Sequence, residues 1–218
     1  TLLWKDFGLV KGVAFDSWRQ IGAVLPAVRV FDRRDVDELV LLDISATLRA
    51  RDPDYELVAD CADACSVPFT VGGGIRNVGQ IQGLLDAGAD KICINSAAYA
   101  EPGLVDRAAA RFGSQCIVAS IDARLMPGIG YRCFSHSGSR ETGRTVVDWA
   151  CELAVRGAGE ILLTSIERDG TLKGYDLDLI SSVTAAVDVP VVASGGAGNY
   201  QHMVDAVLYF EGESSSRF

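Results

Sequence analysis

The sequence has no apolar run long enough to cross a membrane and no segment with the pattern of a signal peptide. Basic residues are also few: 20 Lys and Arg stand against 29 Asp and Glu, which gives a formal net charge of −9. Nucleic acids and anionic membranes are bound by basic surfaces, so neither is expected as a partner. We therefore expect a cytoplasmic protein without a nucleic-acid or membrane partner.

Metal-binding patterns are scarce as well. The chain contains 2 His and 6 Cys, and no two cysteines form a Cys-x-x-Cys pair. A zinc site is therefore not expected, and we predict neither a metal nor a cofactor. The cysteines are interpreted as free thiols, several of them buried, in a reducing compartment.

The sequence is rich in short apolar runs of the length of a buried strand. Amphipathic segments separate several of them, such as 55–64 and 78–87, and this alternation predicts a parallel sheet with right-handed helical crossovers. No shift in composition marks a boundary, so residues 1–218 are predicted to form a single α/β domain. The expected strands are 38–43, 68–71, 91–95, 116–122, 160–164 and 190–194.

The two halves of the chain resemble each other. Leu41-Leu42-Asp43 has a counterpart in Leu162-Leu163-Thr164, and glycine groups stand at a similar offset, at 72–74 and 195–196. A repeat of this length is typical of a (βα)8 TIM barrel assembled from two half-barrels. The alternative is that any buried strand ending in glycine resembles any other.

The two ends of the sequence fit a full barrel poorly. Residues 1–4 are barely enough for a first strand, and the segment after the helical stretch 200–207 is too short for an eighth strand and helix. We therefore predict a barrel that is incomplete at strand 1 and at strand and helix 8. The glycine-rich segment 124–143 is predicted to form a short hairpin over the strand ends.

Glycine groups follow the predicted strands at the end where α/β proteins carry their sites. Backbone N–H groups of such glycines can close on a phosphate. Two groups stand at matching places in the repeat, so we predict a substrate with a phosphate at each end. The first group is Gly74, Asn95 and Ser96. The second group is Thr164, Asp169, Gly170, Gly195 and Gly196.

Three charged side chains lie near the same strand ends. Asp43 and Asp122 end apolar runs, where partial burial raises the pKa of a carboxyl group towards neutrality and suits it to acid–base catalysis. The alternative is that each aspartate caps a helix or pairs with a cation. Lys11, expected in the loop after strand one, either attracts a phosphate or is a solvated surface lysine.

Charged residues also stand at the opposite, N-terminal ends of three strands. They are Glu38, Lys91 and Glu160. Such residues are usually solvated strand starts. Alternatively, the three could form a charged ring at the bottom of the barrel.

A collinear set of segments carries a family resemblance between about residue 2 and about residue 207. The segments are 38–46, 68–75, 88–98, 112–115, 135–138, 157–171 and 193–198. They resemble the cyclase subunit of imidazole glycerol phosphate synthase, a lyase of histidine biosynthesis. The resemblance implies a (βα)8 barrel that forms a heterodimer with a glutaminase subunit docked on its bottom. Ammonia would pass through the barrel to a two-phosphate ribulosyl-formimino carboxamide nucleotide at the top.

The resemblance also implies roles for individual residues. Asp122 would be one of two catalytic aspartates. One phosphate of the substrate would be held by Gly74, Asn95 and Ser96, and the other by Asp169, Gly170 and Gly196. Glu38, Lys91 and Glu160 match three members of a charged ring that gates ammonia, which favours the ring over solvated strand starts.

One position departs from the family pattern. Leu3 stands where the family has its other catalytic aspartate, and leucine cannot move a proton. A branch of the family shares this change, and those paralogues are associated with surface-polysaccharide (lipopolysaccharide) biosynthesis, where they are thought to deliver ammonia for amidation of a nucleotide-linked sugar. The segments 8–11, 16–22 and 51–54 also look like that branch.

Three hypotheses about function follow. The first is an ammonia-using synthase subunit, either the sugar-amidating paralogue, which Leu3 favours, or a true histidine-pathway cyclase. The second is a non-catalytic channel subunit that only activates its glutaminase. The third is the related sugar isomerase of the histidine pathway, which Leu3 and the charged ring disfavour.

Overall fold

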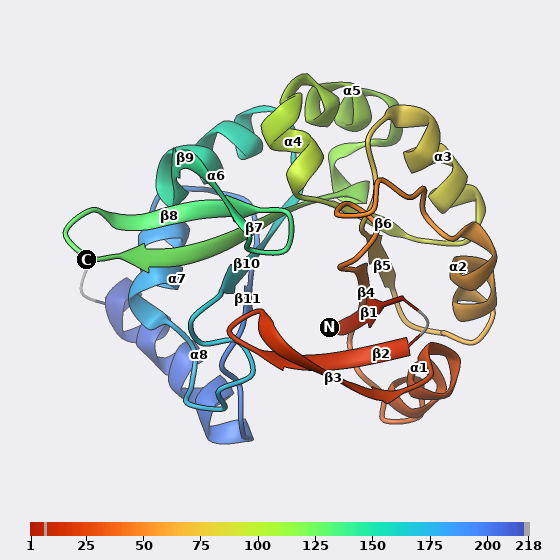
Figure 1. The fold of residues 1–218 in the computed structure, drawn as a ribbon. Coiled ribbons are helices and arrows are strands. Elements are labelled where there is room, and N and C mark those ends of the chain that lie inside the picture. Colours follow the sequence, from red (N-terminus) through yellow and green to blue (C-terminus); the bar gives the residue numbers. More distant parts are fainter. Residues whose placement is uncertain (7, 216–218) are drawn as a thin grey trace.

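The computed structural model describes residues 1–6 and 8–215, and its parallel strands form the wall of an α/β barrel of the TIM type. Figure 1 shows these strands at the centre with helices around the outside. In order of pairing, the parallel strands are β1 (Leu2–Lys5), β4 (Leu39–Asp43), β5 (Phe69–Gly72), β6 (Lys91–Ile94), β7 (Ile117–Met126), β10 (Glu160–Ser165) and β11 (Val191–Ser194).

Helices connect the strands and cover the outer face of the sheet. Four of them begin at a polar side chain that accepts a hydrogen bond from a backbone N–H three residues on, and these caps are Asp54, Asn77, Thr145 and Asp176. The helices are α1 (Val24–Asp32), α2 (Tyr55–Ala62), α3 (Val78–Asp86), α4 (Ser96–Ala100), α5 (Gly103–Phe112), α6 (Val146–Val155), α7 (Leu177–Thr184) and α8 (Tyr200–Ser215), with a short 3-10 turn at Ser114–Cys116.

Apolar side chains fill the space on both faces of the sheet. The larger core lies between the strands and the helices and includes the fully buried Phe69 and Trp149. A smaller cluster of Cys93, Val118 and Leu162 forms separately, on the inner face. Burial on both faces explains why these strands read as continuous apolar runs in the sequence.

The residues at the start of the sequence do form a strand of the barrel wall, although a short one of four residues. Leu2–Lys5 form β1, which pairs in parallel with β4, and α1 follows. An antiparallel hairpin, β2 (Gly8–Val13) and β3 (Asp16–Gly22), is inserted between them. The sequence did not reveal this hairpin because the residues of β3 are largely exposed and carry no apolar alternation.

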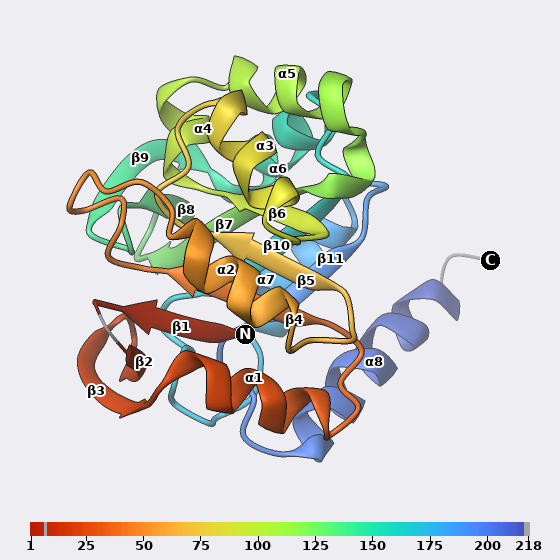
Figure 2. The same cartoon turned by 90° about the vertical axis from the view of Figure 1, so that its right-hand side faces the viewer.

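At the C-terminal side of the sheet, β7, β10 and β11 lie next to one another in chain order, as expected for a parallel barrel wall. Among the described residues the parallel strands end at β11, and no strand is paired with its outer edge. The helix expected at 200–207 is longer and runs to Ser215, and Figure 2 shows α8 extending away from the barrel. Within the described part of the chain, no helix has the length and apolar character needed to cross a membrane.

The hairpin predicted at 124–143 is confirmed. Strand β7 continues to Met126 and pairs in antiparallel fashion with β8 (Gly130–Ser135), which pairs with β9 (Arg140–Thr145). Asp122 therefore lies inside a long strand rather than after its end. All six cysteines are free thiols, as the sequence suggested.

Candidate active site at the mouth of the barrel

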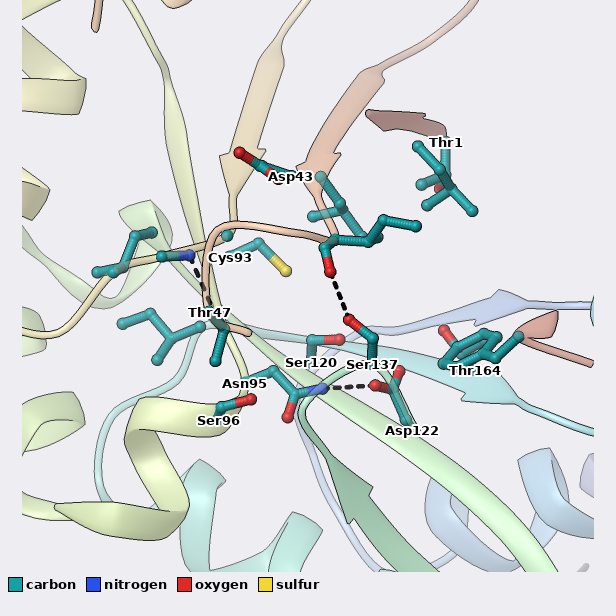
Figure 3. A pocket seen from close by; sticks show the side chains of 18 of the residues that line it. Thr1, Asp43, Thr47, Cys93, Asn95, Ser96, Ser120, Asp122, Ser137 and Thr164 are labelled. Atoms are coloured by element: carbon teal, nitrogen blue, oxygen red, sulfur yellow. Dashed lines mark hydrogen bonds between the residues drawn. The ribbon is translucent and has the colours of Figure 1, made fainter. Parts of the chain in front are cut away.

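A pocket opens at the C-terminal ends of the parallel strands, the end where barrel enzymes carry their sites. Figure 3 shows it from close by, with side chains from several strands pointing into it. Its polar lining residues are Thr1, Asp43, Thr47, Asn95, Ser96, Ser120, Asp122, Ser137, Thr164, Asp169 and Ser194. Among the described residues, no lysine or arginine lines it.

Asp122 lies deep in this pocket and is only 8% exposed. Desolvation by burial raises its pKa to about 7, a hydrogen bond from Asn95 opposes that rise, and repulsion from Asp169 adds to it. The Nδ2 group of Asn95 donates to Asp122 Oδ2 at 2.8 Å (Figure 3). A carboxyl group with a pKa near neutrality can give and take a proton at cellular pH, so the geometry suits the acid–base role predicted for Asp122.

The first predicted phosphate group does come together at one side of the pocket. Gly74, Asn95 and Ser96 all line it. The Gly74 N–H points towards Thr47 Oγ1 at 3.4 Å, and Ser96 Oγ accepts from the backbone N–H of His136. The Asn95 amide is already engaged by Asp122, so this side chain has a second task besides any contact with phosphate.

Asp43 reaches the pocket wall, but its carboxylate is occupied by its own loop. Oδ1 accepts hydrogen bonds from the backbone N–H groups of Ser45 and Ala46 and from the Ser45 hydroxyl, at 2.8 to 2.9 Å. Oδ2 forms an ion pair with Arg51 at 3.2 Å. The structure therefore favours the alternative reading of Asp43, a residue that shapes the loop after β4.

The second predicted phosphate group is only partly brought to the pocket. Thr164 and Asp169 line it, whereas Gly170, Gly195 and Gly196 do not. The β2–β3 hairpin packs on this loop: Ala14 N–H donates to Asp169 O at 2.9 Å, and a Cβ on Gly170 would lie 2.0 Å from Gly12 O. The hairpin thus covers part of the predicted cradle.

The inner face of the same hairpin forms a wall of the pocket. Phe15 and Trp18 line it, with their ring centroids 6.5 Å apart. Lys11 is exposed, lies in β2 rather than in a loop, and is opposite Arg19 across the hairpin. Lys11 is not among the residues that line the pocket, although its charge acts on the amine of Thr1, which does line it.

Leu3 lines the pocket from β1, where the resemblance would place a second catalytic aspartate. It pairs with Leu42 in the neighbouring strand. Asp6 follows directly after β1, but its carboxylate pairs with Arg49 and is absent from the pocket lining. Asp6 therefore does not replace the missing proton carrier.

A strained turn ties the rim of the pocket together. His136, Ser137 and Gly138 follow one another with positive φ angles of 53°, 55° and 78°. Ser137 Oγ donates to Ile44 O at 2.7 Å, which joins the β8–β9 turn to the loop after β4 (Figure 3). Non-glycine residues in this conformation cost energy and cluster at functional sites.

Glu38, Lys91 and Glu160 meet at the opposite end of the barrel. Lys91 Nζ bridges the two carboxylates, at 2.8 Å from Glu38 and 2.9 Å from Glu160, and Thr70 Oγ1 donates to Glu38 at 2.5 Å. Desolvation lowers the pKa of Lys91, but the two carboxylates outweigh it and the net shift is upwards. The lysine is therefore a permanent cation, and the three side chains form a charged cluster rather than separate solvated strand starts.

The inner face of the sheet connects this cluster to the pocket. Because side chains alternate along a strand, Glu160, Leu162 and Thr164 point inward from successive levels of β10. β6 repeats the order with Lys91 and Cys93, and Asn95 follows the strand at the pocket. The interior thus changes from charged, through apolar, to polar.

Several lining residues were not singled out from the sequence. Phe15 and Trp18 belong to the unrecognised hairpin, and Ser120 and Ser194 lie inside apolar runs. A period of two counted back from Asp122 would have found Ser120, since residues two apart share a face of a strand. No signal of that kind was available for the hairpin.

Comparison with known proteins agrees with this arrangement. Residues 5–214 match the family described as histidine biosynthesis protein. The imidazole glycerol phosphate synthase subunit HisF of Hyphomonas neptunium (strain ATCC 15444) is 48% identical over 212 residues, which are 97% of this chain and 83% of that protein. The chain therefore belongs to the histidine biosynthesis protein family.

Proposed function

We propose that this chain is an ammonia-using synthase subunit, similar to the cyclase subunit of imidazole glycerol phosphate synthase, that works with a glutaminase subunit. The observation that carries the proposal is the change in the lining of the barrel interior, from charged at one end to polar at the other. A charged cluster at Glu38, Lys91 and Glu160 lies at one end, and the pocket with Asp122 lies at the other. Ammonia released by a glutaminase docked at the charged end would travel inside the sheet to an acceptor in the pocket.

The acceptor is proposed to be phosphorylated. Backbone N–H groups around Gly74 and Ser96 would bind one phosphate, and the loops with Asp169, Gly170 and Gly196 would bind another once the hairpin moves off Gly170. Asp122 would transfer the proton that ammonia gives up when it attacks the acceptor.

Leu3 supports a paralogue that serves nucleotide-sugar amidation for surface polysaccharide. A cyclisation that relies on two carboxylates loses one of them at this position, and a hydrocarbon side chain cannot stand in for it. The true cyclase remains a second candidate because of the 48% identity to HisF. A purely glutaminase-activating channel is the third reading.

One reconstitution separates the true cyclase from the other two readings. The purified chain is mixed with a cognate glutaminase subunit and glutamine, with and without the two-phosphate histidine-pathway nucleotide, and glutamate and imidazole glycerol phosphate are both followed. Glutamate release without the imidazole product is the expected result for the paralogue and also for the purely glutaminase-activating channel. Robust formation of that product would show a true cyclase, and an absence of glutaminase stimulation would contradict all three readings.

A matched pair of variants sharpens the test. Leu3→Asp places a carboxylate at the position where the family has its other catalytic aspartate. Leu3→Asn adds a polar side chain of similar volume that has no carboxyl proton to transfer. Imidazole product from the Asp variant alone would show that residue 3 decides between cyclisation and ammonia delivery. Equal behaviour of the two variants would show that other residues decide.

A further inference from the structure

Two arginines face each other on the β-ribbon that β7 and β8 form beside the mouth of the barrel. Strand β7 continues past Asp122 to Met126, and Arg124 lies directly opposite Arg132 in its pairing with β8. Figure 1 shows β7 and β8 running on beyond the ring of parallel strands. Like charges directly opposite each other on antiparallel strands destabilise a sheet, so the fold alone gives no reason for this pair.

The chain itself neutralises neither arginine well. Arg124 has no carboxylate within ion-pair distance among the described residues, and its guanidinium lies over the ring of Phe134, 4.7 Å from the centroid. Arg132 Nε comes no closer than 3.9 Å to its carboxylate partner, Glu141. That Nε is buried without a hydrogen-bond partner in the described part of the chain, although Nη1 reaches Gly143 O at 3.4 Å. A buried donor of a charged group without an acceptor is costly, which points to an anion that completes the site.

The arginine pair lies on the same face of the ribbon as Asp122. Side chains alternate along a strand, so Asp122 and Arg124 point to the same side of β7. Phe134 and Arg132 lie opposite them on β8 and share that side. The step from Asp122 to Arg124 is two residues, or about 7 Å. A sugar attached to an anion held by the arginines would therefore extend towards the pocket.

We propose that Arg124 and Arg132 form a subsite for the diphosphate of a nucleotide-linked acceptor, whose sugar enters the pocket towards Asp122. A guanidinium group binds a phosphate through two parallel N–H···O bonds, so two such groups on adjacent strands match two phosphates joined by one oxygen. The inference rests on the paralogue reading of the proposed function. The two-phosphate substrate of the cyclase carries its phosphates at opposite ends rather than joined.

The subsite recognises the diphosphate rather than the base. Phe134 is only 6% exposed, and the guanidinium of Arg124 lies over its ring. A nucleobase therefore finds no free aromatic face here on which to stack. Affinity should follow the number of linked phosphates, with little contribution from the nucleoside.

The probe is UDP, titrated by calorimetry into the purified chain, with uridine, inorganic phosphate and inorganic pyrophosphate as comparison ligands. UDP is expected to bind at least about 10-fold more tightly than inorganic phosphate, because only UDP engages both guanidinium groups. Uridine is expected not to compete with UDP. Arg124→Gln and Arg132→Gln should each weaken UDP binding by about 10-fold or more, because charge-assisted contacts are lost.

Glu141→Gln provides a test that misfolding does not imitate. Loss of this carboxylate leaves Arg132 free for the ligand, so UDP should bind several-fold more tightly than to the unaltered chain. The matched control is Arg140→Gln, an exposed arginine next to Glu141 on β9 and so on the opposite face of the ribbon. It should leave UDP binding unchanged. Circular dichroism checks that each variant is folded.

Three results would overturn the proposal. The first is an absence of UDP binding, or UDP binding that both arginine variants leave unchanged, since the diphosphate would then be held elsewhere. The second is equal affinity for UDP and inorganic phosphate, which would show a general anion surface. The third is binding of pyrophosphate but not of UDP, which would assign the pair to a free anion. No glutaminase is present in these titrations, so none of the three results decides whether the chain receives ammonia from one.

Discussion

At the scale of single residues, Asp122 shows a conflict between stability and function. Burial raises its pKa from 3.8 to about 7, so the folded chain binds the proton more tightly than the unfolded chain does. Stability on this account is greatest below pH 4, falls as the pH rises towards 7, and stays low above it. A group kept at this cost near neutrality is typical of a functional site.

The first prediction concerns Asp122→Asn. The amide oxygen can still accept from Asn95 Nδ2, while the buried charge disappears. At pH 8 the variant should unfold at a higher urea concentration than the unaltered chain. The gain in the free energy of unfolding should be up to about 4 kcal/mol if the full pKa shift of roughly 3 units is realised. At pH 4 the two proteins should be nearly equal. Lower stability of the variant at pH 8 would mean that the charged carboxylate is stabilised by a partner.

Lys91 presents the opposite case. Its net pKa shift is upwards, so its ion pairs contribute stability throughout the range below about pH 10 and lose it only as the pH rises through the folded value. The lysine and both carboxylates are no more than 26% exposed, so solvent screens these pairs only partly.

Lys91→Met should therefore lower the free energy of unfolding by about 2 kcal/mol, because Glu38 and Glu160 are left without a cation. The loss should be the same at pH 6 and pH 9, since Lys91 is charged at both. Lys173→Met, an exposed lysine with no carboxylate within ion-pair distance among the described residues, should change stability by less than about 0.5 kcal/mol. Urea denaturation at the two pH values checks both statements, and a pH-dependent loss would contradict the assignment.

At the scale of elements, the β2–β3 hairpin links the two sides of the mouth. Its inner face lines the pocket with Phe15 and Trp18, and its turn is bonded to the loop after β10 through Ala14 and Asp169. Three non-glycine residues of the hairpin have positive φ angles, namely Ala14, Phe15 and Ser17. An element with strained residues and an exposed strand is one that we expect to move easily.

Gly170→Ala tests this link. The added Cβ would lie 2.0 Å from Gly12 O, so the hairpin must lift off the loop. Gly128→Ala is the control, because Gly128 has a similar φ of +72° against +69° and nothing within 4 Å of the new atom. Both changes carry about 1 kcal/mol of left-handed strain. Only the former should shift Trp18 fluorescence to the red and speed tryptic cleavage after Lys11 or Arg19. Equal behaviour would show that the hairpin does not rest on Gly170.

The hairpin also marks the limit of what the sequence predicts. The strand at 160–164 was predicted within one residue because burial on both faces makes it a continuous apolar run. The strand at 190–194 was also predicted within one residue from its apolar run, although its residues are only partly buried or exposed. The hairpin has no such apolar run. Its turn has Ala14 and Phe15 at positions with positive φ, where glycine or asparagine would have indicated a turn in the sequence. Its missed position is why Lys11 was expected near a phosphate.

At the scale of the whole molecule, the sequence was enough to assign functional side chains to one end of the barrel or the other. It was not enough to predict their contacts at the mouth. Inward-facing positions follow from alternation along each strand, so Asp122 and the cluster of Glu38, Lys91 and Glu160 could be assigned to opposite ends. The engagement of Asp43 by Ser45 and Arg51 depends on how a loop folds, and no periodic pattern encodes that.

The interior between those ends provides the last prediction. Val118 is 1% exposed and lies in the small inner cluster with Cys93 and Leu162, between the charged end and the pocket. Val118→Phe should narrow this passage at a cost of about 1–3 kcal/mol in stability. In the complex with a glutaminase, glutamate should still be formed, but the ammonia should escape to solution instead of reaching the pocket.

The control for Val118→Phe is Val58→Phe. It overpacks the outer core beneath α2 to a similar extent, but its side chain does not enter the space inside the sheet. It should lose stability and retain delivery of ammonia to the acceptor. External ammonium salt at alkaline pH should restore amidation in the Val118 variant, because it reaches the open mouth directly. Unimpaired delivery in that variant would mean that ammonia takes another route to the pocket, and the charged cluster would then be a structural feature of the barrel alone.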